Sequence, residues 1–211
     1  MKTPNSDRPT QFDLPSTPLL IVLSGPSGVG KDALLTRMKQ QGYPLNYVTT
    51  VTTRAKRAKE RDSKDYYFVS VARFREMLDS NELLESANVY GNWYGVPRKP
   101  IQDALERGQD TIVKVDIQGA ATIKKNAPEA LFIFLMPPSL AELITRLNQR
   151  RTELPFDLAL RIKTAEEELK QLPLFDYVVI SERDKLDLAV SDIEAIITAE
   201  KHRVNPRKIT L

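Results

Sequence analysis

Short apolar runs separated by amphipathic segments dominate the hydrophobic pattern of this chain. Residues 19–23 form an unbroken apolar run, and similar runs recur at 111–115, 131–136 and 177–180. Apolar runs of this length are typical of strands buried on both faces of a parallel sheet. Apolar residues at helical spacing predict helices over 31–39, 97–107, 117–125, 139–147 and 185–202. The alternation predicts an α/β fold in which helices flank a parallel sheet.

The pattern changes between residues 50 and 96, which predicts an inserted subdomain. A basic loop there is followed by a strand-like stretch at 66–69, a short helix near 71–80 and a second strand-like stretch at 82–90. The charged, Pro155-containing stretch 148–161 predicts a mobile lid before a helix over 161–172. The polar, proline-containing residues 1–17 predict a disordered tail. The core would then consist of residues 18–49, 97–147 and 162–211.

Composition narrows the possible chemistry. The chain has 211 residues, no cysteine and one histidine, His202. Disulfides, thiolate zinc sites, cysteine nucleophiles and paired-histidine metal sites are therefore excluded, and a Ser-His-Asp triad is disfavoured. No apolar run approaches the ~20 residues that span a bilayer. We expect a soluble, cytoplasmic protein without a membrane partner, and the oligomeric state stays open.

Basic residues are concentrated in two short segments. The net charge is only +3, which does not by itself predict nucleic-acid binding, and none is expected. Five Lys and Arg side chains nevertheless fall within residues 54–61, and Arg146, Arg150 and Arg151 form a second group. Two basic segments predict either solvated charged faces or binding to two anionic groups.

A glycine-rich loop joins the first predicted strand to the first predicted helix. Its residues fit the pattern GxxxxGK and are Gly25, Pro26, Ser27, Gly28, Val29, Gly30 and Lys31. Glycines let backbone N–H groups turn inward, the helix N-terminus adds a positive dipole, and the lysine reaches the β- and γ-phosphates of a nucleotide. The next residue is Asp32, where the pattern expects a Ser or Thr that ligates Mg²⁺.

The chain resembles the guanylate kinase family over about residues 19–203. The motifs that carry the resemblance lie at 24–31, 52–54 with Arg57, 64–66, 68–69, 91–95, 115–119 and 137–139. The resemblance implies a P-loop core, a GMP-binding subdomain and a lid. It also implies that the γ-phosphoryl group of ATP is transferred, with Mg²⁺, to GMP or dGMP, giving ADP and the guanosine diphosphate.

The resemblance assigns a guanine pocket and a phosphate site. Glu85 and Asp116 would face the guanine N1–H and 2-amino donors, and Thr50 would donate to O6. Adenine would place an acceptor against a carboxylate, so the pocket would reject it. The GMP phosphate would be bound by Arg54, Arg57, Tyr66 and Tyr94, since arginine binds phosphate in a bidentate manner.

The resemblance also assigns the residues that act on ATP. Residues 25–32 would bind its phosphates, and the catalytic residues would be Lys31, Arg146, Arg150 and Arg161. Phosphoryl transfer depends mainly on positioning and charge neutralisation, which these cations would supply.

Asp32 and Lys114 depart together from the family pattern. The family usually has a hydroxyl residue on the loop, where Asp32 stands, and often an acid on the strand, where Lys114 stands two residues before Asp116. The carboxylate therefore looks moved from the strand to the loop. Asp32 would either ligate Mg²⁺ or pair with Lys114, which would offset its negative charge.

Two alternative functions stay open. The first is a guanylate-kinase-like binding module that has lost catalysis, which the intact phosphate loop disfavours and Asp32 weakly favours. The second is a related ribose-bisphosphate phosphokinase, which would not need the guanine-facing pair Glu85 and Asp116.

Overall fold

A parallel sheet forms the centre of the protein. The computed structural model describes residues 17–58, 60–89, 91–149, 163–164 and 166–211. Five strands lie in the order β2-β7-β1-β8-β9, and every neighbouring pair is parallel. They are β1 (Leu20–Ser24), β2 (Asn46–Tyr47), β7 (Thr111–Lys114), β8 (Leu131–Met136) and β9 (Tyr177–Ile180). The predicted α/β fold with a helix-flanked parallel sheet is confirmed.

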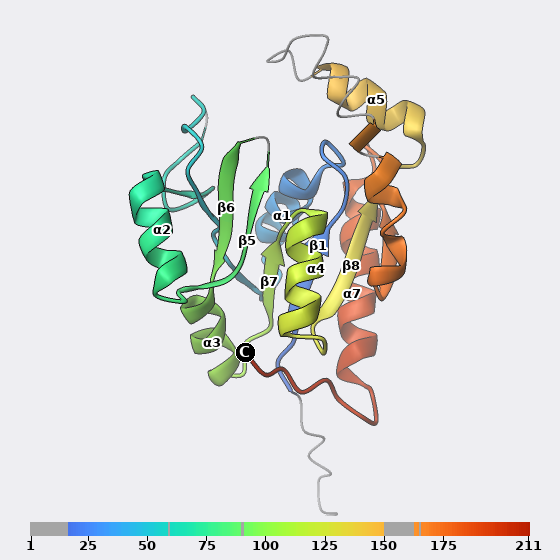
Figure 1. Cartoon of the computed structure of the whole chain (residues 1–211). Helices are drawn as coiled ribbons and strands as arrows, with labels where there is room; N and C mark the ends of the chain where they lie inside the picture. The colour runs from blue at the N-terminus through green and yellow to red at the C-terminus, as the bar shows by residue number, and fades with distance from the viewer. Residues whose placement is uncertain (1–16, 59, 90, 150–162, 165) are drawn as a thin grey trace, which may run out of the picture.

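Helices cover both faces of this sheet (Figure 1). They are α1 (Lys31–Gln40), α3 (Arg98–Glu106), α4 (Ile117–Asn126) and α7 (Leu186–Lys201). On one face Ile21 belongs to a core cluster with Leu34 of α1 and Ile193 of α7. On the other face Val22 belongs to a cluster with Ala120 of α4. Because successive side chains of β1 enter opposite clusters, the strand is apolar throughout.

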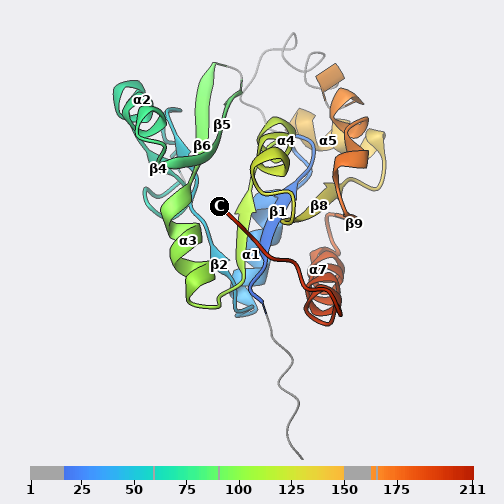
Figure 2. The ribbon, with the colours of Figure 1, turned by 60° about the horizontal axis from the view of Figure 1, so that its bottom comes forward.

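A second, smaller sheet lies beside the first (Figure 2). Its order is β4-β3-β6-β5, with β3 parallel to β4 and the other pairs antiparallel. Its strands are β3 (Val51–Thr52), β4 (Tyr67–Phe68), β5 (Leu83–Val89) and β6 (Asn92–Pro97). Helix α2 (Val71–Asp79) packs on it through Phe74, which is buried with Val51 and Leu83. Ser70 caps α2 by accepting a hydrogen bond from the Arg73 N–H at 3.1 Å.

The predicted tail and lid lie almost wholly outside the described residues. Of the tail only Thr17 is described, and of the lid only the last two residues of α5 (Leu140–Gln149). Beyond the lid, residues 163–164 and 166–169 are helical, followed by the 3-10 turn η1 (Leu172–Leu174). Within the ranges given above, no helix is long and apolar enough to cross a membrane.

Candidate active site

The glycine-rich loop lies at the carboxyl end of β1, between the ends of β7 and β8. Gly25 has φ +145°, and a Cβ there would lie 2.2 Å from the Leu135 carbonyl oxygen, so a side chain would collide with backbone. The Lys31 ammonium donates to the carbonyl oxygens of Gly25 at 2.5 Å and Pro26 at 3.3 Å. Lys31 thus folds back over the loop that the sequence predicts to bind phosphate.

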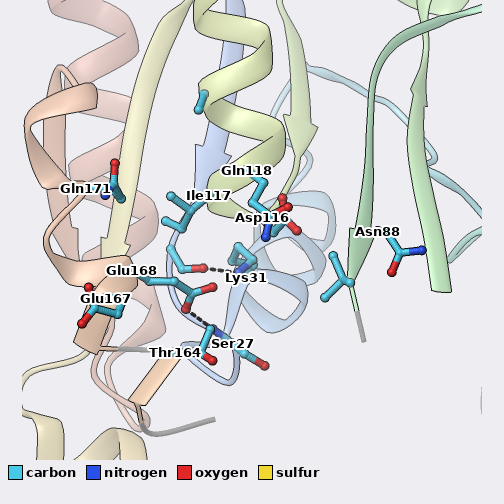
Figure 3. Close-up of a pocket in the computed structure, with 13 residues that line it drawn as sticks. Ser27, Lys31, Asn88, Asp116, Ile117, Gln118, Thr164, Glu167, Glu168 and Gln171 are labelled. Atoms are coloured by element: carbon cyan, nitrogen blue, oxygen red, sulfur yellow. Dashed lines mark hydrogen bonds between the residues drawn. The ribbon is translucent and has the colours of Figure 1, made fainter. Parts of the chain in front are cut away.

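A pocket of about 580 Å³ opens beside this loop (Figure 3). Its lining includes Ser27 and Lys31 of the loop, Asp116 at the start of α4, Asn88 of β5 and Glu168. A carboxylate oxygen of Glu168 accepts a hydrogen bond from the Ser27 N–H at 3.4 Å. Burial lowers the pKa of Lys31, although the charges of Glu168 and Asp32 oppose this effect. The pocket therefore combines the Ser27 backbone N–H and a desolvated ammonium group, which suits a phosphate.

Glu85 is a buried acid on β5 that lies against the first turn of α4. Glu85 is 5% exposed, and its Oε2 atom has no hydrogen-bond partner among the residues that the structure describes. Burial, and secondarily the charge of Asp116, raises the pKa of Glu85 to about 8. Asp116 caps α4 by accepting from the Gly119 N–H at 2.7 Å. A Cβ on Gly119 would lie 2.8 Å from Glu85 Oε2, so the glycine makes room for the carboxyl.

The two predicted guanine-facing acids are therefore close enough to interact electrostatically. The third predicted guanine contact, Thr50, is buried immediately before β3 at 6% exposure. A buried carboxyl without a partner is unfavourable unless a ligand supplies donors. The arrangement can accept hydrogen bonds from a ligand that presents two neighbouring N–H groups.

The pKa of Glu85 predicts a pH-dependent stability. Because this pKa lies above that of glutamate in the unfolded chain, the folded state holds the proton more tightly. The stabilisation is complete below the ordinary glutamate pKa and is lost as pH rises through about 8. Relative to the Glu85→Gln variant, the parent should lose free energy of unfolding between about pH 5 and pH 8. Urea denaturation across that range checks this, and parallel pH profiles for the two proteins would contradict it.

Arg54 is the centre of the predicted GMP-phosphate site. Its guanidinium lies 5.3 Å from the centroid of the Tyr66 ring, and its Nε donates to the Tyr94 hydroxyl at 3.2 Å. Arg57, by contrast, is 60% exposed at its side chain and reaches Glu60 only at 4.0 Å. The structure therefore brings Arg54, Tyr66 and Tyr94 together, whereas the Arg57 side chain extends into solvent beside this group.

Sequence reasoning missed Glu60 at this site. Its two carboxylate oxygens accept from Nη2 and Nη1 of Arg54 at 2.8 and 3.0 Å, and one also accepts from the Arg57 N–H at 2.8 Å. Burial would raise the pKa of Glu60, but these hydrogen bonds lower it on balance. Glu60 thus engages the arginine fork that would face a phosphate. The sequence offered one signal for this role, since Glu60 is an acid within the basic segment 54–61.

Asp32 and Lys114 form the ion pair that the pairing hypothesis predicts. The Lys114 ammonium donates to a carboxylate oxygen of Asp32 and, at 3.1 Å, to the Tyr66 hydroxyl. Burial lowers the pKa of Lys114, but the charge of Asp32 and the contact with Tyr66 raise it overall. The lysine side chain is 15% exposed and the aspartate side chain 68% exposed. A shielded cation is therefore neutralised by an exposed anion.

Arg146 lies behind the phosphate loop. It is 8% exposed and donates to the carbonyl oxygens of Val29 at 2.7 Å and Ser181 at 2.8 Å, and to Glu142 at 2.9 Å. These bonds connect α5, the loop and the residue after β9. In this structure the guanidinium therefore holds the backbone of the loop in place. Its predicted role in catalysis stays a prediction. The other two predicted lid-side arginines, Arg150 and Arg161, lie outside the described residues.

A phosphate loop of this form, at the carboxyl edge of a parallel sheet and next to a pocket, places the protein among the P-loop nucleotide-binding proteins. The family model described as guanylate kinase matches residues 17–200. Guanylate kinase 2, chloroplastic/mitochondrial, of Oryza sativa subsp. japonica is 45% identical over 93% of this chain and 70% of its own length. The guanylate kinase of Carboxydothermus hydrogenoformans is 41% identical over 90% and 92%, respectively.

A solved structure agrees with this placement. The crystal structure of guanylate kinase from Anaplasma phagocytophilum has a TM-score of 0.72 and 33% identity, and the match covers 90% of both chains. The chain therefore belongs to the guanylate kinase family.

Proposed function

We propose that this protein transfers the γ-phosphoryl group of ATP to GMP, or to dGMP, forming ADP and the corresponding diphosphate. Membership of the guanylate kinase family supports the reaction. One observation best supports GMP as the phosphoryl acceptor: the buried carboxyl group of Glu85 has an Oε2 atom that receives no hydrogen bond within the described part of the chain. Guanine presents N1–H and 2-amino donors, whereas adenine has no donor at N1.

The two phosphate sites would lie on different parts of the fold. Arg54, Tyr66 and Tyr94 belong to the segment around the smaller sheet and would bind the GMP phosphate. The loop over residues 25–32 would bind the ATP phosphates. A GMP phosphate oxygen is already an anion at neutral pH, so it can attack the γ-phosphorus without a general base. The protein's task is then to align the two phosphates and neutralise their charge.

The residues near the loop fit a magnesium ion that is shared with ATP. Within the described ranges, no group of three or more acidic or histidine side chains could hold a metal ion by itself. Mg²⁺ prefers oxygen ligands and commonly combines one or two carboxylates with phosphates and water. The exposed Asp32 carboxylate suits that chemistry and would hold the ion together with phosphate oxygens. When bound, Mg²⁺ would neutralise charge on the ATP phosphates.

A coupled assay of ADP formation across several acceptors tests the proposal. With ATP and Mg²⁺, we expect turnover with GMP and dGMP, and much less with AMP, UMP and a ribose bisphosphate. Preferential turnover of the ribose bisphosphate would favour the phosphokinase alternative. Binding of GMP without any ADP formation would favour the binding-module alternative.

We also predict that GMP and ATP together close the structure. The two ligands would bring negative charge to cationic side chains on facing parts of the fold, so charge neutralisation favours approach. The radius of gyration from solution scattering should fall when a non-hydrolysable ATP analogue and GMP are both added. Superimposable scattering curves with and without both ligands would contradict hinge closure.

A further inference from the structure

Lys114 lies between the two proposed phosphate sites. It is the last residue of β7, and its Cα pairs in register with Leu23, just before the phosphate loop. Its ammonium contacts Asp32 in the first turn of α1 on one side and the Tyr66 hydroxyl, at 3.1 Å, on the other. The same nitrogen is 4.5 Å from the centroid of the Tyr66 ring. One cation thus touches a residue of each proposed phosphate site.

We propose that Lys114 is a catalytic residue whose ammonium group donates a hydrogen bond to the phosphoryl group as it passes from ATP to GMP. This inference rests on the proposed function. A GMP phosphate oxygen forms the new bond to the γ-phosphorus while the bond from that phosphorus to the β–γ bridging oxygen breaks. ADP leaves with the electron pair of the broken bond. Lys114 stays protonated throughout and loses no proton.

The side chains around Lys114 permit this role. An ammonium group has three donors, and the contacts with Asp32 and Tyr66 among the described residues use two of them. Asp32 is the exposed member of the ion pair, so its carboxylate can turn toward solvent or a metal ion while the lysine stays in place. The low exposure of Lys114 reduces solvent screening, which strengthens its attraction to a phosphoryl group.

Charge around the loop supports the same conclusion. Burial has the largest effect in lowering the pKa of Lys31, and the positive charge of Lys114 lowers it further, so the two ammonium groups interact. Without a ligand, the carboxylates of Asp32 and Glu168 offset this concentration of positive charge. A transferring phosphoryl group would supply the same negative charge between the two lysines in the complex.

The main alternative is that Lys114 only neutralises Asp32. The two roles differ in a double variant. If Lys114 is merely a counterion, Lys114→Met should be harmful because Asp32 loses its ammonium partner, and adding Asp32→Ser should restore activity. If Lys114 contacts the phosphoryl group, Asp32→Ser should not rescue Lys114→Met.

The first experiment compares kcat and KM of the parent, Asp32→Ser, Lys114→Met, Lys114→Arg and the double variant. We expect kcat to fall about 100-fold in Lys114→Met and in the double variant, with KM for GMP changed less than about threefold. Lys114→Arg should recover part of the loss because it keeps the charge. Lys99→Met, at a lysine whose side chain is 83% exposed on α3, is the matched control. A double variant as active as Asp32→Ser would overturn the proposal.

A binding measurement separates this inference from the proposed function. The probe is a bisubstrate compound in which adenosine and guanosine are joined through five phosphates. Calorimetry should show that Lys114→Met weakens the bisubstrate at least tenfold and GMP alone less than threefold. Equal weakening of both would place Lys114 in the GMP site alone and overturn the inference. If the parent binds the bisubstrate but forms no GDP from ATP and GMP, the proposed function fails. The binding comparison still shows whether Lys114 lies between the two phosphate sites.

Discussion

Replacing Lys31 with methionine should reduce kcat by about 10²- to 10³-fold, the usual cost of removing one donor that stabilises transition-state charge. Methionine keeps most of the length of the side chain but removes the ammonium group. In the ligand-free loop this group bonds the carbonyl oxygens of Gly25 and Pro26. It would exchange those contacts for phosphate oxygens. Steady-state measurement of GDP formation at saturating ATP and GMP checks the loss.

The control for this experiment is Lys185→Met. Lys185 is 57% exposed and pairs with Glu182, so its replacement removes a lysine outside the loop. Circular dichroism should show that both variants are folded. A Lys31→Met enzyme with kcat within a few-fold of the parent would contradict the assignment of the loop as the ATP-phosphate site.

Glu85→Gln should lower kcat/KM for GMP about 10- to 150-fold, which corresponds to ~1.5–3 kcal/mol for a hydrogen bond to a charged group. With guanine bound, Glu85 would give up the proton that its pKa of about 8 retains in the ligand-free protein. The resulting carboxylate can accept from both guanine donors, whereas a glutamine amide has only one acceptor oxygen and would direct its NH₂ group at a donor. KM for ATP should change little because the proposed ATP site lies on the phosphate loop. Initial rates over a matrix of both substrates separate the two constants.

Glu106→Gln provides the matched control, since Glu106 is an exposed glutamate at the end of α3. It should leave both constants unchanged. An unaltered kcat/KM for GMP in Glu85→Gln would remove Glu85 from the guanine pocket.

Strands β1, β7 and β8 of the central sheet could be predicted because they are buried on both sides. The run at 19–23 is apolar at every position, and β1 accordingly has no exposed face. The two-residue strands Asn46–Tyr47 and Val51–Thr52 were not predicted, because two residues carry no periodicity. Strand β6 (Asn92–Pro97) was recognised only as part of a family motif and not as a strand, because it contains a glycine and a proline, which are uncommon within strands.

The candidate site was predictable where its chemistry is local in sequence. The phosphate loop is one continuous motif, and its glycines mark it directly. The Asp32–Lys114 pair could be inferred because both residues depart together from the family pattern, with opposite charges. Glu60 and the contacts of Arg146 with Val29 and Ser181 were missed, since no local pattern says which hydrogen-bonding partners a folded chain brings to a charged side chain. Those partners depend on tertiary packing of α5 and of the basic segment.

The most direct measurement follows the γ-phosphoryl group of ATP itself. The protein is incubated with ATP labelled with ³²P at the γ-position, Mg²⁺ and GMP, and the products are separated chromatographically. The proposed function predicts that label appears in GDP in proportion to enzyme and time, and that Lys31→Met nearly abolishes it. Label that stays in ATP or appears only as inorganic phosphate, while GMP binding is shown in parallel, would contradict the proposal.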